Sequence, residues 1–410
     1  MRSLAAWLVA DALALTGTRL AAVALPWLAL TTTGSATAAG LVAFAELAPL
    51  VLAKVLAGPL VDRLGARPVA VACDAASAVA IGSIPVLHHL DLLSLPLLLV
   101  VVAVAGALRG PADAAKDSLV PVLADTTGQP LERVTGLSSA VERTAGLVGA
   151  AAAAGLVAVV GAADALAVNA AGLALAASVL AVGGRGLGVA QRPDGDDEGY
   201  RRRLQAGWRF LRGEPVVLSL TVMVALTNLL DVAFTAVLLP VWAAETGAGV
   251  GAVGLLLAVM AGTSVLGSLV AAAWAERMPR FTLYVVAFCV TGLPRFAVLA
   301  WSGSTEWPVA VLAVAGLASG FLNPVLGAVF YERIPRELVG RVGALSTALA
   351  FALMPFGGLV GSALLAAGGL TGALLVAGGL YLLVTLAPLA DRRFRGMDER
   401  PRDPLAAGVV

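Results

Sequence analysis

Twelve apolar runs of roughly 20 residues, separated by short polar segments, constrain this chain more than any other feature. A helix needs about 20 apolar residues to cross a bilayer, and it satisfies its own backbone hydrogen bonds in lipid. The chain is 60% hydrophobic and 13% charged, whereas a soluble domain carries about 25% charged residues. We therefore predict an all-α polytopic membrane protein with twelve transmembrane helices.

The predicted helices form two sets of six. They span 4–30, 37–60, 68–87, 93–120, 136–160 and 163–183, and then 216–242, 248–274, 281–301, 307–331, 341–366 and 370–390. The predicted domains are an N-terminal six-helix bundle (1–183), a linker (184–215), a C-terminal six-helix bundle (216–390) and a tail (391–410). Leu204, Trp208 and Leu211 recur at helical spacing among arginines, so the linker is predicted to contain an amphipathic helix.

Basic residues occupy one side of the predicted membrane. They lie at Arg63, Arg67, Lys116, Arg133, 185–212, Arg277, Arg280, 333–341 and 392–402. The alternate loops, at 31–37, 88–92, 161–163, 245–250, 302–306 and 368–371, contain no lysine or arginine. Because cytoplasmic loops are enriched in these residues, we predict a multi-pass protein of the plasma (inner) membrane with the linker and both termini in the cytoplasm.

The two halves of the chain repeat with an offset of 214 residues. The matching positions are Pro26 with Pro240, Gly40-Leu41 with Gly254-Leu255, Asp62-Arg63 with Glu276-Arg277, and Pro121 with Pro335. Because each half holds an even number of predicted helices, the repeats run parallel. They are then related by a pseudo-twofold axis along the membrane normal.

A charged segment, Gly58 to Arg67, separates the second and third apolar runs and is predicted to be a short loop at the membrane surface. Its pattern resembles the loop between the second and third helices of major facilitator superfamily transporters. The matching residues are Gly58, Leu60, Asp62, Arg63, Gly65 and Arg67. The resemblance implies the major facilitator fold, with alternating access by rocking of the two bundles and a cavity lined by helices 1, 4, 7 and 10.

The resemblance also implies a cytoplasmic gate. Asp62 is expected to hold the N-terminus of helix 11 near Gly340 when the cytoplasmic side is closed, where a carboxylate meets the helix dipole. Arg63 is expected to pair with Asp117 at the end of helix 4.

Further motifs resemble bacterial twelve-helix exporters of drugs and siderophores. These motifs are Ala24-Leu25-Pro26-Trp27, Thr33-Gly34-Ser35 and Pro111-Ala112. The resemblance implies secondary active export of a small amphipathic molecule by proton antiport, with the proton gradient as energy source and no cofactor. Proton-driven exporters typically carry Gly-Pro-x-x-Gly-Gly in helix 5, whereas this chain has Ala150 where the proline is expected. An importer or lipid translocator of the same fold stays open, as does a non-transporting receptor or enzyme.

Ionisable and polar residues at membrane depth are the candidate pathway for protons or substrate. They are Asp11, Arg19, Glu46, Arg109, Asn228, Asp231 and Asn323. Helical rise places Asp11 level with Arg109, and Arg19 roughly 6 Å in depth from Glu46. Each of these predicted pairs is either a proton relay or a static link between helices. Lys54 with Asp74 is predicted to be structural, and no partner is predicted for Arg295.

Prolines and glycines within the apolar runs are candidate hinges or packing positions. They are Pro111, Gly149, Gly155, Pro324, Pro355, Gly357 and Gly358. Helices 4 and 10 are predicted to be interrupted at matching places, Arg109-Gly110-Pro111 and Asn323-Pro324. Such interruptions serve either a gate or packing alone.

The remaining motifs argue against other functions. No phosphate-binding loop occurs, which argues against an ATP-driven pump. His88 and His89 are adjacent and would point about 100° apart on a helix, which makes a poor metal site. The predicted partners are a small-molecule substrate and the lipid bilayer, with no metal and no nucleic acid, and the chain is predicted to be a monomeric transporter rather than an enzyme.

Overall fold

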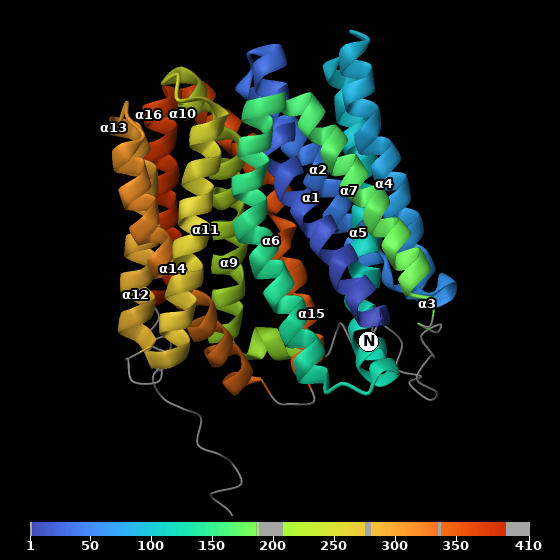
Figure 1. Ribbon diagram of the computed structural model, residues 1–410. Helices are drawn as coiled ribbons and strands as arrows, with labels where there is room; N and C mark the ends of the chain where they lie inside the picture. Colours follow the sequence, from blue (N-terminus) through green and yellow to red (C-terminus); the bar gives the residue numbers. More distant parts are fainter. Residues whose placement is uncertain (1, 186, 188–207, 275–279, 335–337, 391–410) are drawn as a thin grey trace, which may run out of the picture.

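The computed structural model describes residues 2–185, 187, 208–274, 280–334 and 338–390, which form helices and short connections without strands (Figure 1). Nine helical segments in these ranges are long and apolar enough to cross a membrane. One of them, Leu345–Leu386, bends at Gly369, which has a φ of 62° close to the boundary predicted between 366 and 370. The all-α membrane class is confirmed, while the count of twelve stays a prediction.

Two groups of helices stand side by side in Figure 1. The first comprises α1 (Arg2–Thr33), α2 (Ala36–Leu56), α3 (Gly58–Leu64), α4 (Ala66–His89), α5 (Leu95–Thr127), α6 (Leu131–Val160) and α7 (Ala162–Gly183). The second comprises α9 (Pro215–Ala233), η1 (Phe234–Leu238), α10 (Leu239–Glu245), α11 (Gly249–Trp274), α12 (Arg280–Thr291), α13 (Leu293–Trp301), α14 (Glu306–Arg333), α15 (Val339–Ala352), η3 (Met354–Phe356), α16 (Gly357–Leu386) and η4 (Ala387–Ala390). We call them the N half and the C half.

The predicted linker helix lies partly outside the described residues, because Leu204 is not among them. Residues 208–213 are helical. The Arg212 guanidinium lies 5.1 Å from the centre of the Trp208 ring, and Leu211 is fully buried against the C half.

The charged segment between α2 and α4 is a short helix, α3, so the prediction of a loop is wrong. Pro59 occupies its first turn, where a proline needs no backbone hydrogen bond. Gly65 then has a φ of 88°, which a residue with a side chain adopts only with strain. From the start of α4, Arg67 donates to the carbonyl oxygens of Leu180 (3.4 Å) and Ala181 (2.5 Å) at the end of α7. Arg67 therefore ties two helices of the N half together.

Two of the predicted helix interruptions are absent, whereas one candidate hinge, Pro355, does interrupt its helix. α5 and α14 run unbroken through Pro111 and Pro324, so the predicted interruptions there are wrong. A proline removes one backbone hydrogen bond, and packing of the flanking turns holds such a helix together. In the C half the chain breaks at Gly292, between α12 and α13, and at Pro355, within the 3₁₀ turn η3.

The internal repeat is visible in how helices pack. A Cβ atom added to Gly110 on α5 would lie 2.5 Å from the Lys54 backbone nitrogen on α2. One added to Gly320 on α14 would lie 2.6 Å from the Ser268 nitrogen on α11. These two contacts are equivalent, so Lys54 corresponds to Ser268, an offset of 214 residues, and Gly110 corresponds to Gly320, an offset of 210. The offset between α5 and α14 is therefore about one helical turn shorter than that between α2 and α11. The match of Arg109 with Asn323 is accordingly wrong.

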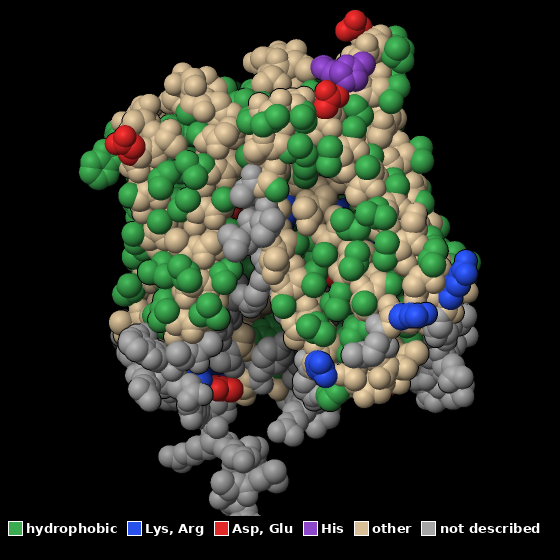
Figure 2. All heavy atoms as spheres, viewed as in Figure 1, with side chains coloured by type: hydrophobic (Ala, Val, Ile, Leu, Met, Phe, Trp, Pro, Cys, Tyr) green, Lys and Arg blue, Asp and Glu red, His purple; other side chains and the backbone are tan. Residues whose placement is uncertain are grey.

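The ends of the helices differ in charge. We call the end that carries Lys54, Arg63 and Arg67 the basic end. Figure 2 shows histidine and acidic side chains at the opposite end and lysine or arginine side chains toward the basic end.

The N half and the C half meet in an apolar cluster toward the opposite end. This cluster, the seal, comprises Leu30, Ala39 and Ala43 of the N half and Val232, Ala236, Val237 and Val241 of the C half. Beside it, Ser362 Oγ on α16 donates to Ala36 O on α2, at 3.0 Å. Near the basic end, the described buried clusters around Leu119 and around Val342 each contain residues of one half only. The structure is therefore closed at the opposite end.

Glycines allow the backbones to touch at the seal. A Cβ atom on Gly358 would lie 2.7 Å from Gly40 O, and one on Gly40 would clash with Gly358 O. We predict that Gly40→Ala destabilises the sealed conformation by about 1–3 kcal/mol, since backbone atoms cannot rotate away as a side chain could. The sealed population would fall roughly 5–150-fold relative to the open one.

Spin labels on Thr33 and Glu245, both exposed at the opposite end, measure this change as a longer inter-label distance. Gly155→Ala is the matched control, because a Cβ atom there meets nothing within 4 Å. An unchanged distance distribution in Gly40→Ala would contradict the seal.

Candidate functional site

Helix α5 presents a stripe of charged residues to the interior of the N half. Arg109 Nε lies 3.5 Å from Asp113 Oδ2, one turn along the same helix. Its Nη2 donates to the carbonyl oxygen of Ala14 on α1, at 3.1 Å. Arg109 therefore links α5 to α1 through a guanidinium that is largely buried.

The predicted direct pair of Asp11 with Arg109 is not formed. The guanidinium reaches Ala14, about one turn beyond Asp11, because Asp113 on its own helix holds the other face of the group. Asp11 still lies within electrostatic range of Lys116, Asp113, Asp117 and Arg109. The structure thus places Asp11 in the charged cluster without an ion pair of its own among the described residues.

The predicted pair of Arg19 with Glu46 is wrong. The Arg19 stem packs against α6, where a Cβ atom on Gly149 would lie 3.0 Å from Arg19 Cβ. Glu46 instead faces a cavity shared with Arg109. Gly149 thus permits close approach of α6 to α1, whereas Gly155 has no neighbour within 4 Å of a Cβ position, so it mediates no close helix contact.

Two further pairings differ from the predictions. Asp74 pairs with Lys116 (Oδ2 to Nζ, 2.7 Å) rather than with Lys54, and both side chains are at most 4% exposed. Lys54 pairs with Asp117 (3.2 Å), which was predicted to bind Arg63, and these two side chains are 39% and 70% exposed. Lys116, treated as a surface residue in the sequence, lies seven residues after Arg109. Residues two turns apart share one face of a helix, so this spacing is the signal that could have placed the Lys116 side chain in the interior beside Arg109.

In the C half, Arg295 has the partner that the sequence did not reveal. Its Nη2 donates to Asp231 Oδ1, and its side chain is 3% exposed. The guanidinium lies 5.2, 4.9 and 4.7 Å from the ring centres of Phe234, Phe296 and Tyr381. Such contacts stabilise a buried cation. The break at Gly292 places Arg295 in the first turn of α13, and the Gly-Leu-Pro sequence there is a breaker signal.

Asp231 and Asn228 offer acceptor oxygens one turn apart on α9. The Asp231 side chain is 39% exposed. Asn228 Nδ2 donates to Ala350 O on α15 at 3.0 Å, which directs the amide toward the neighbouring helix. The side chain of Asn323, the third predicted polar group of the C half, lies outside the described part.

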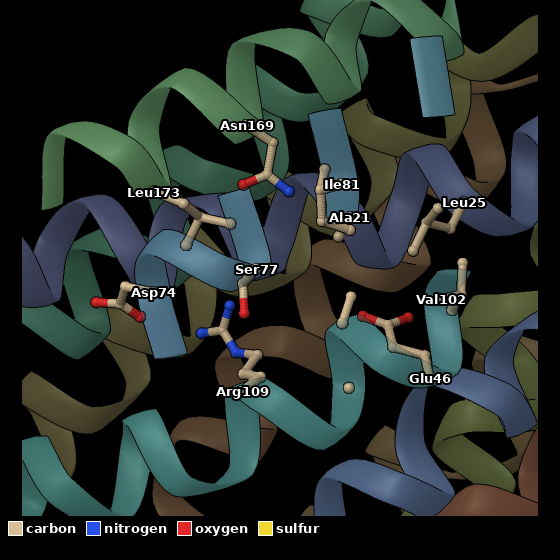
Figure 3. Close-up of a pocket in the computed structure, with 12 residues that line it drawn as sticks. Ala21, Leu25, Glu46, Asp74, Ser77, Ile81, Val102, Arg109, Asn169 and Leu173 are labelled. Atoms are coloured by element: carbon tan, nitrogen blue, oxygen red, sulfur yellow. The ribbon is translucent and has the colours of Figure 1, made fainter. Parts of the chain in front are cut away.

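A cavity of about 30 Å³ lies inside the N half, between α1, α2, α4, α5 and α7 (Figure 3). Its polar lining residues are Glu46, Asp74, Ser77, Arg109 and Asn169. Ser77 Oγ and Asn169 Oδ1 are buried without a hydrogen-bond partner in the structure. Sequence reasoning missed both residues, although each is an isolated polar group in an apolar helical run.

The predicted gate makes no contact between the halves. Asp62 and Arg63 are exposed, and no ion pair or hydrogen bond of theirs is found among the described residues. Glu276-Arg277, the repeat counterpart of Asp62-Arg63, lies outside the described residues. Residues 335–337, shortly before α15, and the side-chain environment of Gly340 are likewise not described. The role of Asp62 in a closed basic end stays a prediction. Within the part of the chain that the structure describes, no group of three or more His, Cys, Asp or Glu residues is placed to hold a metal.

Comparison with known proteins gives concordant matches. The sequence model described as Major Facilitator Superfamily matches residues 8–230 and 221–407. Multidrug efflux pump Tap of Mycobacterium tuberculosis is 30% identical over 362 residues, or 87% of this chain and 85% of the relative. Its namesake from Mycolicibacterium fortuitum is 28% identical, covering 83% and 84%.

Solved structures of similar fold include the nucleoside transporter NupG and a D-xylose-proton symporter. NupG has a TM-score of 0.71 and 14% identity, covering 94% of this chain and 98% of its own. The symporter has a TM-score of 0.73 and 14% identity, covering 97% and 99%.

We predict that Lys116→Met strongly destabilises the protein, because it leaves the buried Asp74 carboxylate unpaired. Breaking a buried pair costs about 3–5 kcal/mol, whereas replacing both partners is far milder. The double variant Asp74→Asn/Lys116→Met should therefore recover most of the melting temperature that Lys116→Met loses in detergent. Lys54→Met is the control, since its exposed pair with Asp117 is worth about 0–1 kcal/mol. Equal losses in Lys116→Met and Lys54→Met would contradict this assignment.

Proposed function

The chain belongs to the major facilitator superfamily, and from this premise we propose that it exports small amphipathic molecules across the plasma membrane by proton antiport. The family and its relatives make it a multi-pass membrane transporter and not an enzyme. Export is supported by the relatives named multidrug efflux pump, which align with most of the chain. The fold alone leaves the direction open, because the D-xylose-proton symporter shares it.

One observation carries the proposed mechanism: among the described buried clusters, those that contain residues of both halves lie toward the opposite end, and those near the basic end each belong to one half. We assign the basic end to the cytoplasm because it carries the lysines and arginines. The sealed conformation is then the one that receives a substrate from inside the cell. Rocking of the halves, residues 1–183 against 216–390, would break the seal and release the substrate outside.

We propose that the C half binds the substrate and that the N half carries the protons. In the C half, Asp231 has one oxygen bound by Arg295 and a side chain that is 39% exposed, so it can accept a hydrogen bond from a substrate together with Asn228. In the N half, Asp11, Glu46, Asp74 and Asp113 are the carboxylates proposed to carry protons. One charge crossing 100 mV supplies about 2.3 kcal/mol, enough for roughly fiftyfold accumulation.

The oligomeric state, the membrane topology and the energy source are proposed as the sequence predicts them. The chain acts as a monomer in the bilayer, with both termini in the cytoplasm, and needs no cofactor beyond the proton gradient. An importer of the same fold is the second candidate, since it also passes through a sealed state.

Ethidium uptake into inverted membrane vesicles tests the direction of transport. In such vesicles the cytoplasmic side faces out, so an acidified interior should drive accumulation of the dye, and a protonophore should abolish it. Vesicles without the protein are the control. Loss of preloaded dye on energisation would favour the importer instead.

Asp62→Asn tests the gate. We predict that this variant inserts normally but loses at least 90% of ethidium transport, because the neutral amide binds a helix N-terminus more weakly than a carboxylate does. Asp91→Asn, an exposed change at the opposite end, should transport like the wild type. Wild-type rates in Asp62→Asn would refute the gating role.

A further inference from the structure

The cavity inside the N half is large enough for a water molecule and has a partly polar lining. Its volume of about 30 Å³ exceeds the roughly 10–15 Å³ that one water molecule requires. Its remaining walls are apolar: Ala21, Leu25, Ile81, Val102, Ala105, Gly106 and Leu173. Because a polar cavity of this size normally contains ordered water, whereas an apolar one stays dry, the polar side of the lining decides its content.

Two unpartnered atoms point to that water. Ser77 and Asn169 are each 5% exposed, and neither Ser77 Oγ nor Asn169 Oδ1 has a hydrogen-bond partner in the structure. Buried polar atoms are almost always satisfied by protein or by ordered water. Gly17 makes room for the amide, because a Cβ atom there would clash with Asn169 Oδ1. Helices α4 and α7 thus each supply one lining residue with a buried polar atom that has no hydrogen-bond partner in the structure.

The charged groups of the cavity form a row. Figure 3 shows the Arg109 guanidinium beside Asp74 and Ser77, with the Glu46 carboxylate farther along the same cavity. No protein hydrogen bond or ion pair of Glu46 is found among the described residues. Asp74 is held by Lys116 at 2.7 Å.

The row continues toward the basic end. Lys116 lies within electrostatic range of Asp11 on α1, and Arg109 contacts Asp113. From one helix to the next, the ionisable groups that face this region are therefore Asp11 (α1), Glu46 (α2), Asp74 (α4), and Arg109, Asp113, Lys116 and Asp117 (α5). They lie within the N half, apart from the Asp231–Arg295 pair of the C half.

We propose that this cavity is a hydrated relay that carries the coupled proton inside the N half, between Glu46 and Asp74. The inference rests on the proposed function, because only a proton-coupled transporter needs such a path. A proton bound by Glu46 passes to water held by Ser77 and Asn169, and water returns one proton to Asp74. From there it leaves toward Asp11 and the cytoplasm. No other reactant is required, and the proton and the substrate use different halves.

Two substitutions remove the water ligands without touching a charge. Asn169→Leu keeps the branching of the side chain but makes it apolar, and Ser77→Ala removes one hydroxyl. The matched controls are Ser178→Ala, exposed on α7, and Ser83→Ala on α4, since both hydroxyls bond to their own helices.

Proteoliposomes separate the two activities. Ethidium counterflow without a proton gradient reports substrate movement, and pyranine trapped inside reports proton movement driven by an ethidium gradient. We expect the ratio of proton movement to counterflow to fall at least tenfold in Asn169→Leu and in Ser77→Ala, with both controls unchanged. A merely structural role would lower the two activities together and leave the ratio intact.

The outcomes distinguish the relay from the proposed function. If Ser77→Ala and Asn169→Leu keep the wild-type ratio, the relay is overturned while export stands. If the wild type shows counterflow but moves no protons, the relay is again overturned. If the wild type shows no counterflow with ethidium, the proposed function fails, and the relay fails with it. Should Asn169→Leu not fold, the ratio in Ser77→Ala decides.

Discussion

The interior of this protein depends on pairing charges where water is absent. An ionised side chain at the centre of a bilayer costs about 2.5–3.5 kcal/mol even on insertion scales. Lys116 and Arg295 are each less than 4% exposed, and each binds a carboxylate on another helix. Aromatic rings surround Arg295 as well. These pairs fix which helix faces meet within each half, and they bring the polar groups of the candidate sites together.

The contact between the halves is of a different kind. Within a half, ion pairs and close glycine contacts join helices, as between α4 and α5 or α2 and α5. Between the halves, the seal consists of apolar side chains, touching glycine backbones and a single described side-chain hydrogen bond from Ser362. Among the described residues of the seal, separation breaks no ion pair. Two firmly joined halves with an uncharged contact are suited to rocking, which is the motion that alternating access requires.

The sequence predicts the class of fold well because the membrane imposes a length on every helix. It predicts side-chain pairing poorly, because the rise per residue gives depth but not the direction in which a side chain points. Arg19 and Glu46 lie at compatible depths, yet Arg19 faces α6. Gly292 breaks its helix while Pro111 does not, since the surrounding packing decides which breaker acts. Ser77 and Asn169 gave no signal beyond being polar in apolar runs.

The central claim is that the halves rock against each other, so that the seal breaks when the basic end closes. Spin labels on Leu56 of α2 and on Arg209 of the linker helix, which packs against the C half, are both exposed near the basic end and measure it directly in proteoliposomes. With ethidium and a proton gradient present, the account predicts a shorter distance at the basic end together with a longer one at the opposite end. Distances that stay fixed, or that lengthen at both ends together, would contradict it.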